Sequence, residues 1–118
     1  MKYDLEERLT NFAVRIIDIV ESLPRTRTGN YLAGQLIRSG TSPALNYGEA
    51  QGAESRQDFI HKMKIIVKEL RETRINLTII HRKKLSRSQN AFPEIADECR
   101  QLISIFVKSI KTAESRKR

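Results

Sequence analysis

The segment from residue 59 to residue 80 carries the strongest periodic pattern in the sequence. Its apolar or small residues recur at alternating steps of four and three, at Phe59, Met63, Ile66, Leu70, Thr73, Leu77 and Ile80. This is the heptad spacing of an α-helix that buries one face against other helices. Ser55, with Asp58 three residues later, can cap its start. The pattern predicts a helix over 55–82 with a buried heptad seam.

Two other segments show helical periodicity. The first has its apolar residues at Leu5, Leu9, Phe12, Ala13, Ile16, Ile17 and Val20, and the last at Ile95, Cys99, Leu102, Ile103, Phe106 and Ile110. Asp4 can cap the first helix and Pro24 should end it, whereas Pro93 suits the first turn of the last helix. We therefore predict helices over 4–23 and 92–114, and we expect residues 114–118 to be disordered.

The segment over 28–51 is less regular. Its buried stripe is expected at Leu32, Leu36, Ser39, Gly40, Pro43, Tyr47 and Ala50. Pro43 lacks a backbone N–H and its ring crowds the preceding turn. The sequence therefore predicts a helix with a kink near Gly40 or a short break.

Four amphipathic helices and short connections define the expected fold. The 118 residues include only three prolines and five glycines, which argues against a turn-rich β-sandwich. We predict an all-α protein, a single domain over 1–118, folded as an antiparallel up-down-up-down four-helix bundle. In its core, we expect Phe59, Met63, Ile66 and Leu70 to pack on Phe12, Ile16, Leu36 and Phe106.

The sequence also limits where the protein works. Cys99 is the only cysteine, so no disulfide can form within the chain, and its place on an apolar stripe predicts a small buried side chain. No run of 18 apolar residues exists, and the acidic start is unlike a signal peptide. We expect a cytoplasmic protein with no membrane partner.

Catalytic chemistry is not indicated. A di-metal site in a bundle needs Glu-x-x-His motifs, and neither His61 nor His81 follows a glutamate at that spacing. No strand is expected that could precede a glycine-rich phosphate loop, and no nucleophile and base can be paired. We predict no enzyme activity, no metal and no cofactor.

Positive charge is the main pointer to a partner. The formal net charge is +8, which favours a polyanion such as nucleic acid. In the predicted bundle, the first and third connections lie at one end. Six cations fall in or beside them: Arg25, Arg27, Arg82, Lys83, Lys84 and Arg87. We call this cluster the basic end. It predicts contacts with RNA or DNA phosphates, although cations at helix C-termini also simply complement helix dipoles. No stacking aromatic residue is expected beside it.

The central third of the chain resembles a known family. The string NYGEAQGAESRQDFIHKMKIIVKELRETRINL over 46–77, preceded by QLIRSGTSPAL, is similar to the 23S ribosomal RNA intervening-sequence proteins, also called four-helix bundle proteins. The resemblance implies a left-handed bundle that assembles as a ring, a homopentamer. Related proteins accompany diversity-generating retroelements, where they bind nucleic acid and a reverse transcriptase. Pro43 and the pair Ile75-Asn76 depart from the familiar pattern of the family.

A mixed polar and apolar surface indicates where subunits could meet. One helix face carries Arg38, Ser42, Leu45 and Glu49, with Asn46 beside them, and a stripe roughly opposite the heptad seam carries Ile65, Glu69, Glu72, Asn76 and Ile79. We predict a subunit interface in which Arg38 meets Glu69 or Glu72 of its own or a neighbouring chain. The alternative is an exposed surface with weak pairs within each helix.

The sequence is compatible with two functions. The first is an oligomeric accessory protein that binds RNA or DNA through the basic end. The alternative is a protein-binding scaffold, associated with a polymerase such as a reverse transcriptase or with a ribosome component, whose charge serves only solubility.

Overall fold

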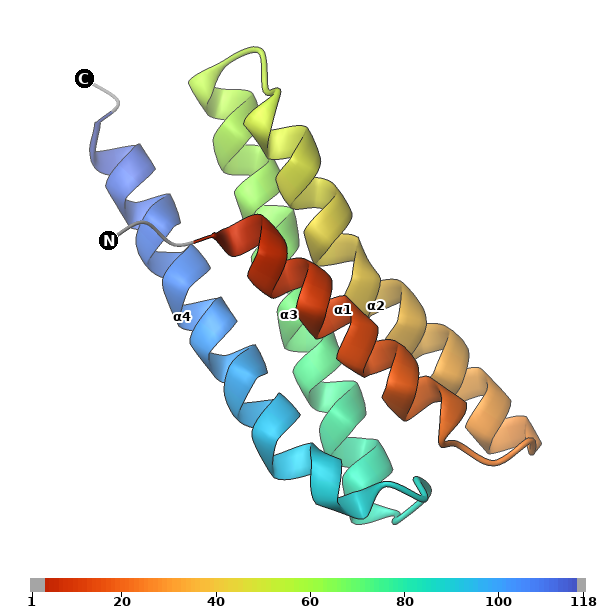
Figure 1. Cartoon of the computed structure of the whole chain (residues 1–118). Helices are drawn as coiled ribbons and strands as arrows, with labels where there is room; N and C mark the ends of the chain where they lie inside the picture. Colours follow the sequence, from red (N-terminus) through yellow and green to blue (C-terminus); the bar gives the residue numbers. More distant parts are fainter. Residues whose placement is uncertain (1–3, 117–118) are drawn as a thin grey trace.

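The computed structural model of the chain describes residues 4–116 (Figure 1). It contains four α-helices and one short 3-10 helix: α1 (Leu5–Glu21), α2 (Arg27–Gln51), α3 (Arg56–Arg82), η1 (Gln89–Ala91) and α4 (Phe92–Ser115). No strand occurs in this range. The predicted all-α fold with four helices is confirmed.

Capping residues account for the helix starts. The side chain of Asp4 accepts a hydrogen bond from the backbone N–H of Glu7, and Ser55 accepts one from Asp58, each at 3.0 Å. Both caps were predicted. The cap of α2 was missed: Thr26 accepts from the N–H of Gly29 at 3.0 Å, so the helix starts one residue earlier than expected.

Two helix ends differ from prediction. Helix α1 ends at Glu21 instead of residue 23, because the N–H of Ser22 donates to the carbonyl of Ile19 and that of Leu23 to the carbonyl of Val20, three residues back instead of four. Helix α4 runs through Ser115, so the expected disorder from residue 114 is wrong for its first two residues. The same prediction covers residues 117–118, which lie outside the described range.

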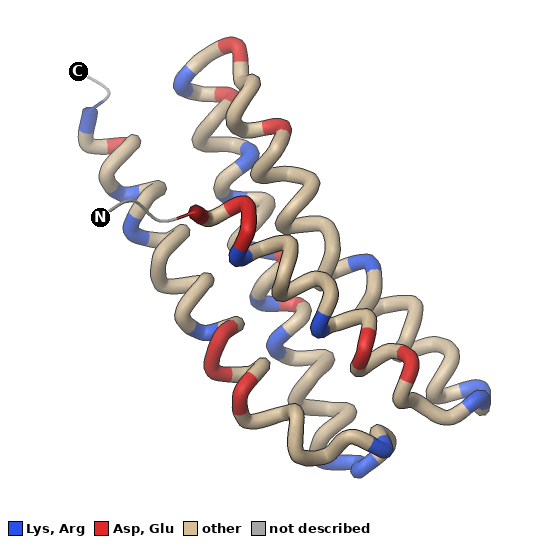
Figure 2. The backbone as a smooth tube through the Cα atoms, in the orientation of Figure 1, with Lys and Arg blue, Asp and Glu red and all other residues tan. Residues whose placement is uncertain are grey.

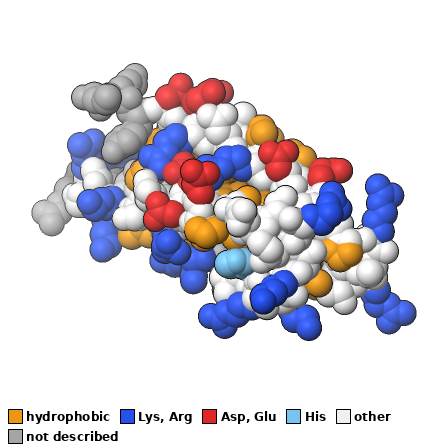
Figure 3. All heavy atoms as spheres, turned by 60° about the horizontal axis from the view of Figure 1, so that its bottom comes forward, with side chains coloured by type: hydrophobic (Ala, Val, Ile, Leu, Met, Phe, Trp, Pro, Cys, Tyr) orange, Lys and Arg blue, Asp and Glu red, His pale blue; other side chains and the backbone are white. Residues whose placement is uncertain are grey.

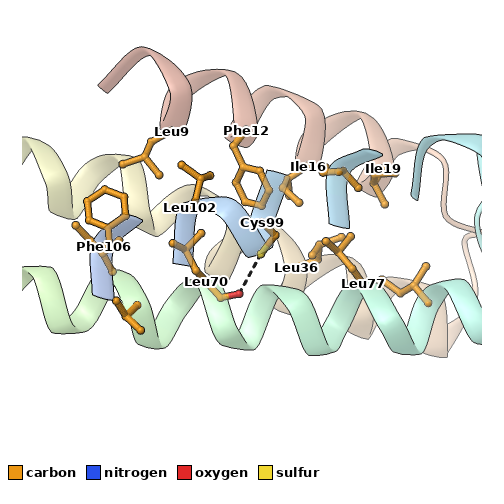
Figure 4. Close-up of a cluster of buried hydrophobic side chains, with 14 of the residues drawn as sticks. Leu9, Phe12, Ile16, Ile19, Leu36, Leu70, Leu77, Cys99, Leu102 and Phe106 are labelled. Carbon is orange, nitrogen blue, oxygen red and sulfur yellow. Dashed lines mark hydrogen bonds between the residues drawn. The ribbon is translucent and has the colours of Figure 1, made fainter. Parts of the chain in front are cut away.

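The core follows the heptad seam and its counterparts on the other helices (Figure 4). Met63, Ile66 and Leu70 are buried as predicted, but Phe59 is only partly buried. Phe59 lies in the first turn of α3, where fewer neighbours cover a side chain, and the next residue, Ile60, is 5% exposed.

The buried face of α1 was slightly misplaced. Ile17 is 39% exposed, whereas Ile19 is 2% exposed. The buried residues of this helix are Leu9, Phe12, Ile16 and Ile19. Ile17 follows Ile16 by one residue and is therefore turned by about 100° from this line.

Helix α2 is continuous through Pro43, so of the two predicted alternatives, a kink near Gly40 or a short break, the break is absent (Figure 1). Pro43 itself is buried, as are Ser39 and Gly40 on the same stripe. These small side chains let neighbouring helices come close. A Cβ atom added at Gly40 would lie 2.7 Å from Cγ2 of Ile16 on α1.

Each α-helix packs against the next α-helix in the chain. The first and last helices, α1 and α4, are in less contact than any of these consecutive pairs. Large side chains such as Phe12 and Leu102 fill the space between α1 and α4 (Figure 4). Two ion pairs bridge these helices on the outside, Arg8 with Glu98 at 2.8 Å and Arg15 with Glu94 at 3.4 Å. The result is an elongated helical bundle, 51 × 27 × 20 Å.

Candidate functional site

The six cations of the basic end lie at the ends of helices and in the connections between them. Arg25 and Arg27 belong to the α1–α2 connection and the start of α2, and the others surround the end of α3 and the connection to α4 (Figure 2). All six are exposed. Neither connection, 22–26 or 83–91, contains an acidic residue. On the face seen in Figure 3, basic side chains project outward around one end of the molecule.

Two buried serines join these connections. The hydroxyls of Ser22 and Ser86 are 2.6 Å apart, and both residues are at least 95% buried. The backbone N–H of Arg87 donates to the carbonyl of Ser22 at 3.1 Å, and its guanidinium donates to the carbonyl of Glu21 at 3.3 Å. The two connections that carry the basic end are thus held together at these residues. Sequence reasoning missed this link, because 64 residues separate the serines.

Lys84 adopts a backbone conformation that usually belongs to glycine. Its φ is 55°, in the left-handed region. It follows the C-cap of α3, where the N–H of Lys84 donates to His81 at 3.1 Å and that of Leu85 donates to Ile80 at 3.2 Å. Glycine is preferred at this place after a helix, since a side chain there costs about 1–2 kcal/mol.

A stacked pair of rings lies beside the basic end. The imidazole of His81 stacks on the ring of Phe92, with centroids 4.9 Å apart and planes 7° from parallel. Phe92 is buried, whereas His81 is exposed next to Arg82. The pair was missed because its members belong to different helices and have no local spacing signal.

Arg38 connects α2 to α3 within one chain. Its Nη1 lies 2.9 Å from Oε1 of Glu69, and its Nη2 lies 2.7 Å from Oε1 of Glu72. The hydrogen bond with Glu72 and the charge of Glu69 raise the pKa of Arg38. Glu69 is only 7% exposed. The prediction that Glu69 lies roughly opposite the heptad seam is therefore wrong. Glu69 lies beside the seam, on the side of α3 that faces Arg38 of α2.

Other predicted interface residues also bond within the chain. Asn46 Nδ2 donates to the carbonyl of Ser42 at 3.1 Å and to its hydroxyl at 2.8 Å. Glu49 pairs with Lys62 at 2.6 Å, a hydrogen bond that raises the pKa of Lys62. Ile65 and Asn76 are half-buried. These polar groups do not require a second subunit.

Exposed apolar side chains occur on the same two helices. Tyr31 and Leu45 on α2 are 66% and 68% exposed, and Ile75 and Ile79 on α3 are 52% and 43% exposed. The predicted interface stripe on α3 included Ile79. It did not include Ile75, which stood out in the sequence only as a difference from the family pattern.

The groups most suited to catalysis are placed unfavourably. Cys99 is fully buried, as predicted, and its Sγ donates to the carbonyl of Leu70 at 3.3 Å (Figure 4). Burial raises the pKa of this thiol to about 12, so it is not a thiolate at neutral pH. Within residues 4–116, no group of three or more His, Cys, Asp or Glu side chains could hold a metal ion. No helix of that range is both long and apolar enough to cross a membrane.

Comparison with known proteins agrees with this architecture. No curated protein is similar enough in sequence to match. A crystal structure of a protein with unknown function from the S23 ribosomal protein family, from Bacteroides thetaiotaomicron, is 32% identical, with a TM-score of 0.80 over 90% of this chain and 97% of that one. The model of the 23S rRNA-intervening sequence protein family matches residues 2–108. With the match extending over all but the chain's ends, this protein belongs to the 23S rRNA-intervening sequence protein family.

Proposed function

We propose that this protein is a non-enzymatic, oligomeric bundle that binds the backbone of RNA or DNA through its basic end. One observation carries the proposal: the buried contact between Ser22 and Ser86 joins two connections that contain cations and no acid. Six positive charges in or beside two joined connections attract a polyanion and release its counterions on contact. Such contacts read the phosphate backbone and carry little information about base sequence.

The strained backbone of Lys84 gives independent support. A glycine would relieve the left-handed conformation, yet the position holds a cation. Strain of this kind persists at functional positions more often than elsewhere. Retaining lysine at a cost in stability is the expected outcome if its charge serves binding.

We further propose that the bundle has the left-handed up-down-up-down arrangement and forms a ring, a homopentamer, through the outer faces of α2 and α3. The exposed Tyr31, Leu45, Ile75 and Ile79 support this surface. The ion pairs of Arg38 stabilise each subunit, and apolar contacts drive assembly. Assembly would multiply the charge of the basic end by the number of subunits.

Assembly is tested with Leu45→Glu, since Leu45 is the most exposed of these side chains. We expect sedimentation velocity to change from an oligomer to a monomer, with helicity unchanged. Val14→Glu on α1, where Val14 is 52% exposed, is the matched control and should remain oligomeric. A wild-type protein that is monomeric at micromolar concentration would contradict the proposal.

Nucleic-acid binding is tested by replacing four cations of the basic end with glutamine: Arg82, Lys83, Lys84 and Arg87. Affinity for unrelated RNAs should fall by similar factors, and the plot of log affinity against log salt should flatten by about 0.7–0.9 per lost phosphate contact. The matched control replaces four cations outside the basic end, Lys64, Lys68, Arg71 and Lys111, and so has the same net charge. Equal losses in both variants would show that only net charge matters.

A further inference from the structure

A second charged surface lies between α3 and α4, away from the basic end. Here α3 up to Arg71 runs beside the last turns of α4 (Figure 1), and the two helices line an open groove of about 380 Å³. Its lining comprises Lys64, Val67, Lys68, Arg71, Val107, Ile110, Lys111 and Glu114. We call it the α3–α4 groove.

The groove combines an apolar floor with cationic edges. Val67 is 6% exposed, and Val107 and Ile110 are partly buried against the core. Four cations face one carboxylate, Glu114, which pairs with Lys64 at 3.1 Å.

The remaining three cations of the groove are exposed on the surface of the subunit. Lys68, Arg71 and Lys111 make no ion pair or side-chain hydrogen bond with any residue of the described range. Their charges are therefore free to meet a partner. In the sequence, the cations at positions 64, 68 and 71 look like any exposed, charged face of a helix, so the sequence alone does not indicate the groove.

We propose that the α3–α4 groove docks an acidic amphipathic α-helix of a protein partner. The apolar floor decides against a nucleic-acid strand, because phosphates and sugars gain little from Val67, Val107 and Ile110. An amphipathic helix fits both parts: its apolar stripe covers the floor, and its flanking carboxylates reach the cations. Lys64 and Arg71 are seven residues apart, about 10 Å along α3, which is two turns of such a helix.

This site is separate from the proposed nucleic-acid surface. The basic end lies where α3 ends, whereas Lys64, Lys68 and Arg71 lie in its first sixteen residues. One subunit can therefore hold nucleic acid at one end and a protein helix near the other. The protein would then bring an acidic partner to nucleic acid.

A designed peptide tests the groove. The probe is a fluorescein-labelled peptide with leucines at positions i, i+3, i+4 and i+7 and glutamates elsewhere, and binding is followed by anisotropy. Its control is an isomer of the same composition with the leucine stripe scrambled. We expect the amphipathic peptide to bind at least tenfold more tightly than the isomer. We expect the double variant Lys68→Glu, Lys111→Glu to lose at least tenfold of that affinity while keeping wild-type helicity.

The same variants separate this site from the basic end. The four glutamine replacements of the basic end should leave peptide affinity within about twofold, and the groove double variant should leave the salt dependence of RNA binding unchanged. Equal binding of the two peptides would overturn the proposal, because it would show attraction by charge alone. RNA that competes with the peptide, together with lost RNA affinity in the groove variant, would assign the groove to nucleic acid instead.

Discussion

Gly40→Ala tests how closely α1 and α2 approach. The new Cβ would lie 2.7 Å from Cγ2 and 2.8 Å from Cγ1 of Ile16. Ile16 is fully buried, and its β-branched side chain has few rotamers to escape into. Insertion of a methyl group into such a core costs about 1–3 kcal/mol. Alanine offsets about 1 kcal/mol of this by its higher helix propensity, so we expect a net loss of up to about 2 kcal/mol.

Two glycines of the same helix provide matched controls. A Cβ added at Gly34 or Gly48 meets nothing within 4 Å, so only the gain in helix propensity remains. Gly34→Ala and Gly48→Ala should each stabilise the protein by about 1 kcal/mol. The same substitution in one helix thus has opposite signs, determined by whether a neighbouring helix is in contact.

Urea unfolding followed by circular dichroism measures these differences, at one protein concentration so that any contribution from assembly is matched. In thermal unfolding, about 4 °C per kcal/mol is expected for a chain of this size. If the Gly40→Ala variant is as stable as the Gly34→Ala variant, then α1 and α2 do not approach each other as closely at Gly40 as the structure indicates. A double variant with Ile16→Ala gives a further check, since removing both Cγ atoms leaves only Cβ of residue 16 near the new methyl group, at 3.1 Å, and should make Gly40→Ala less costly.

Four further predictions concern the core and the basic end. Leu70→Ala should cost about 2–5 kcal/mol in urea unfolding, from lost burial and the cavity left behind. Ser86→Ala should cost about 1–3 kcal/mol, because it removes a buried hydrogen bond. Lys84→Gly should raise stability by about 1 kcal/mol while weakening RNA affinity in a filter-binding assay. Burial raises the pKa of Cys99 from 9.0 to about 12. The contribution of the protonated thiol to the free energy of unfolding is therefore complete below pH 9.0 and decreases above it. Between about pH 8 and pH 10.5, the free energy of unfolding of the wild type should fall by about 2 kcal/mol relative to that of Cys99→Ala.

The sequence predicts the fold well because its information is local. Heptad spacing and capping residues act over three or four positions, and they place the helices within a few residues of their observed bounds. The errors occur where the neighbours of a residue decide its burial. Phe59 and Ile17 both fit an apolar pattern, but one lies near a helix end and the other beside the buried line.

The candidate sites depend on contacts between distant segments, which periodicity does not encode. The hydroxyls of Ser22 and Ser86 meet only after the helices have packed. The same holds for His81 on Phe92, whose contact supplies an aromatic ring next to cations. Chain order alone correctly brings the first and third connections to one end, yet it cannot show that buried hydrogen bonds join them.

Arg38 shows why an interface is harder to predict than a fold. Its spacing to Glu69 and Glu72 fits a contact within one chain and a contact between chains equally well. The geometry decides for the first, since both carboxylates lie within 3 Å of one guanidinium in the same subunit. An ion pair already made inside the subunit gains little on assembly and would have to be rearranged to serve a neighbour. If subunits associate through α2 and α3, as proposed, the energy has to come from the apolar side chains exposed on those helices. This is why Leu45→Glu is a sharper test of assembly than Glu69→Ala, which would also destabilise the subunit.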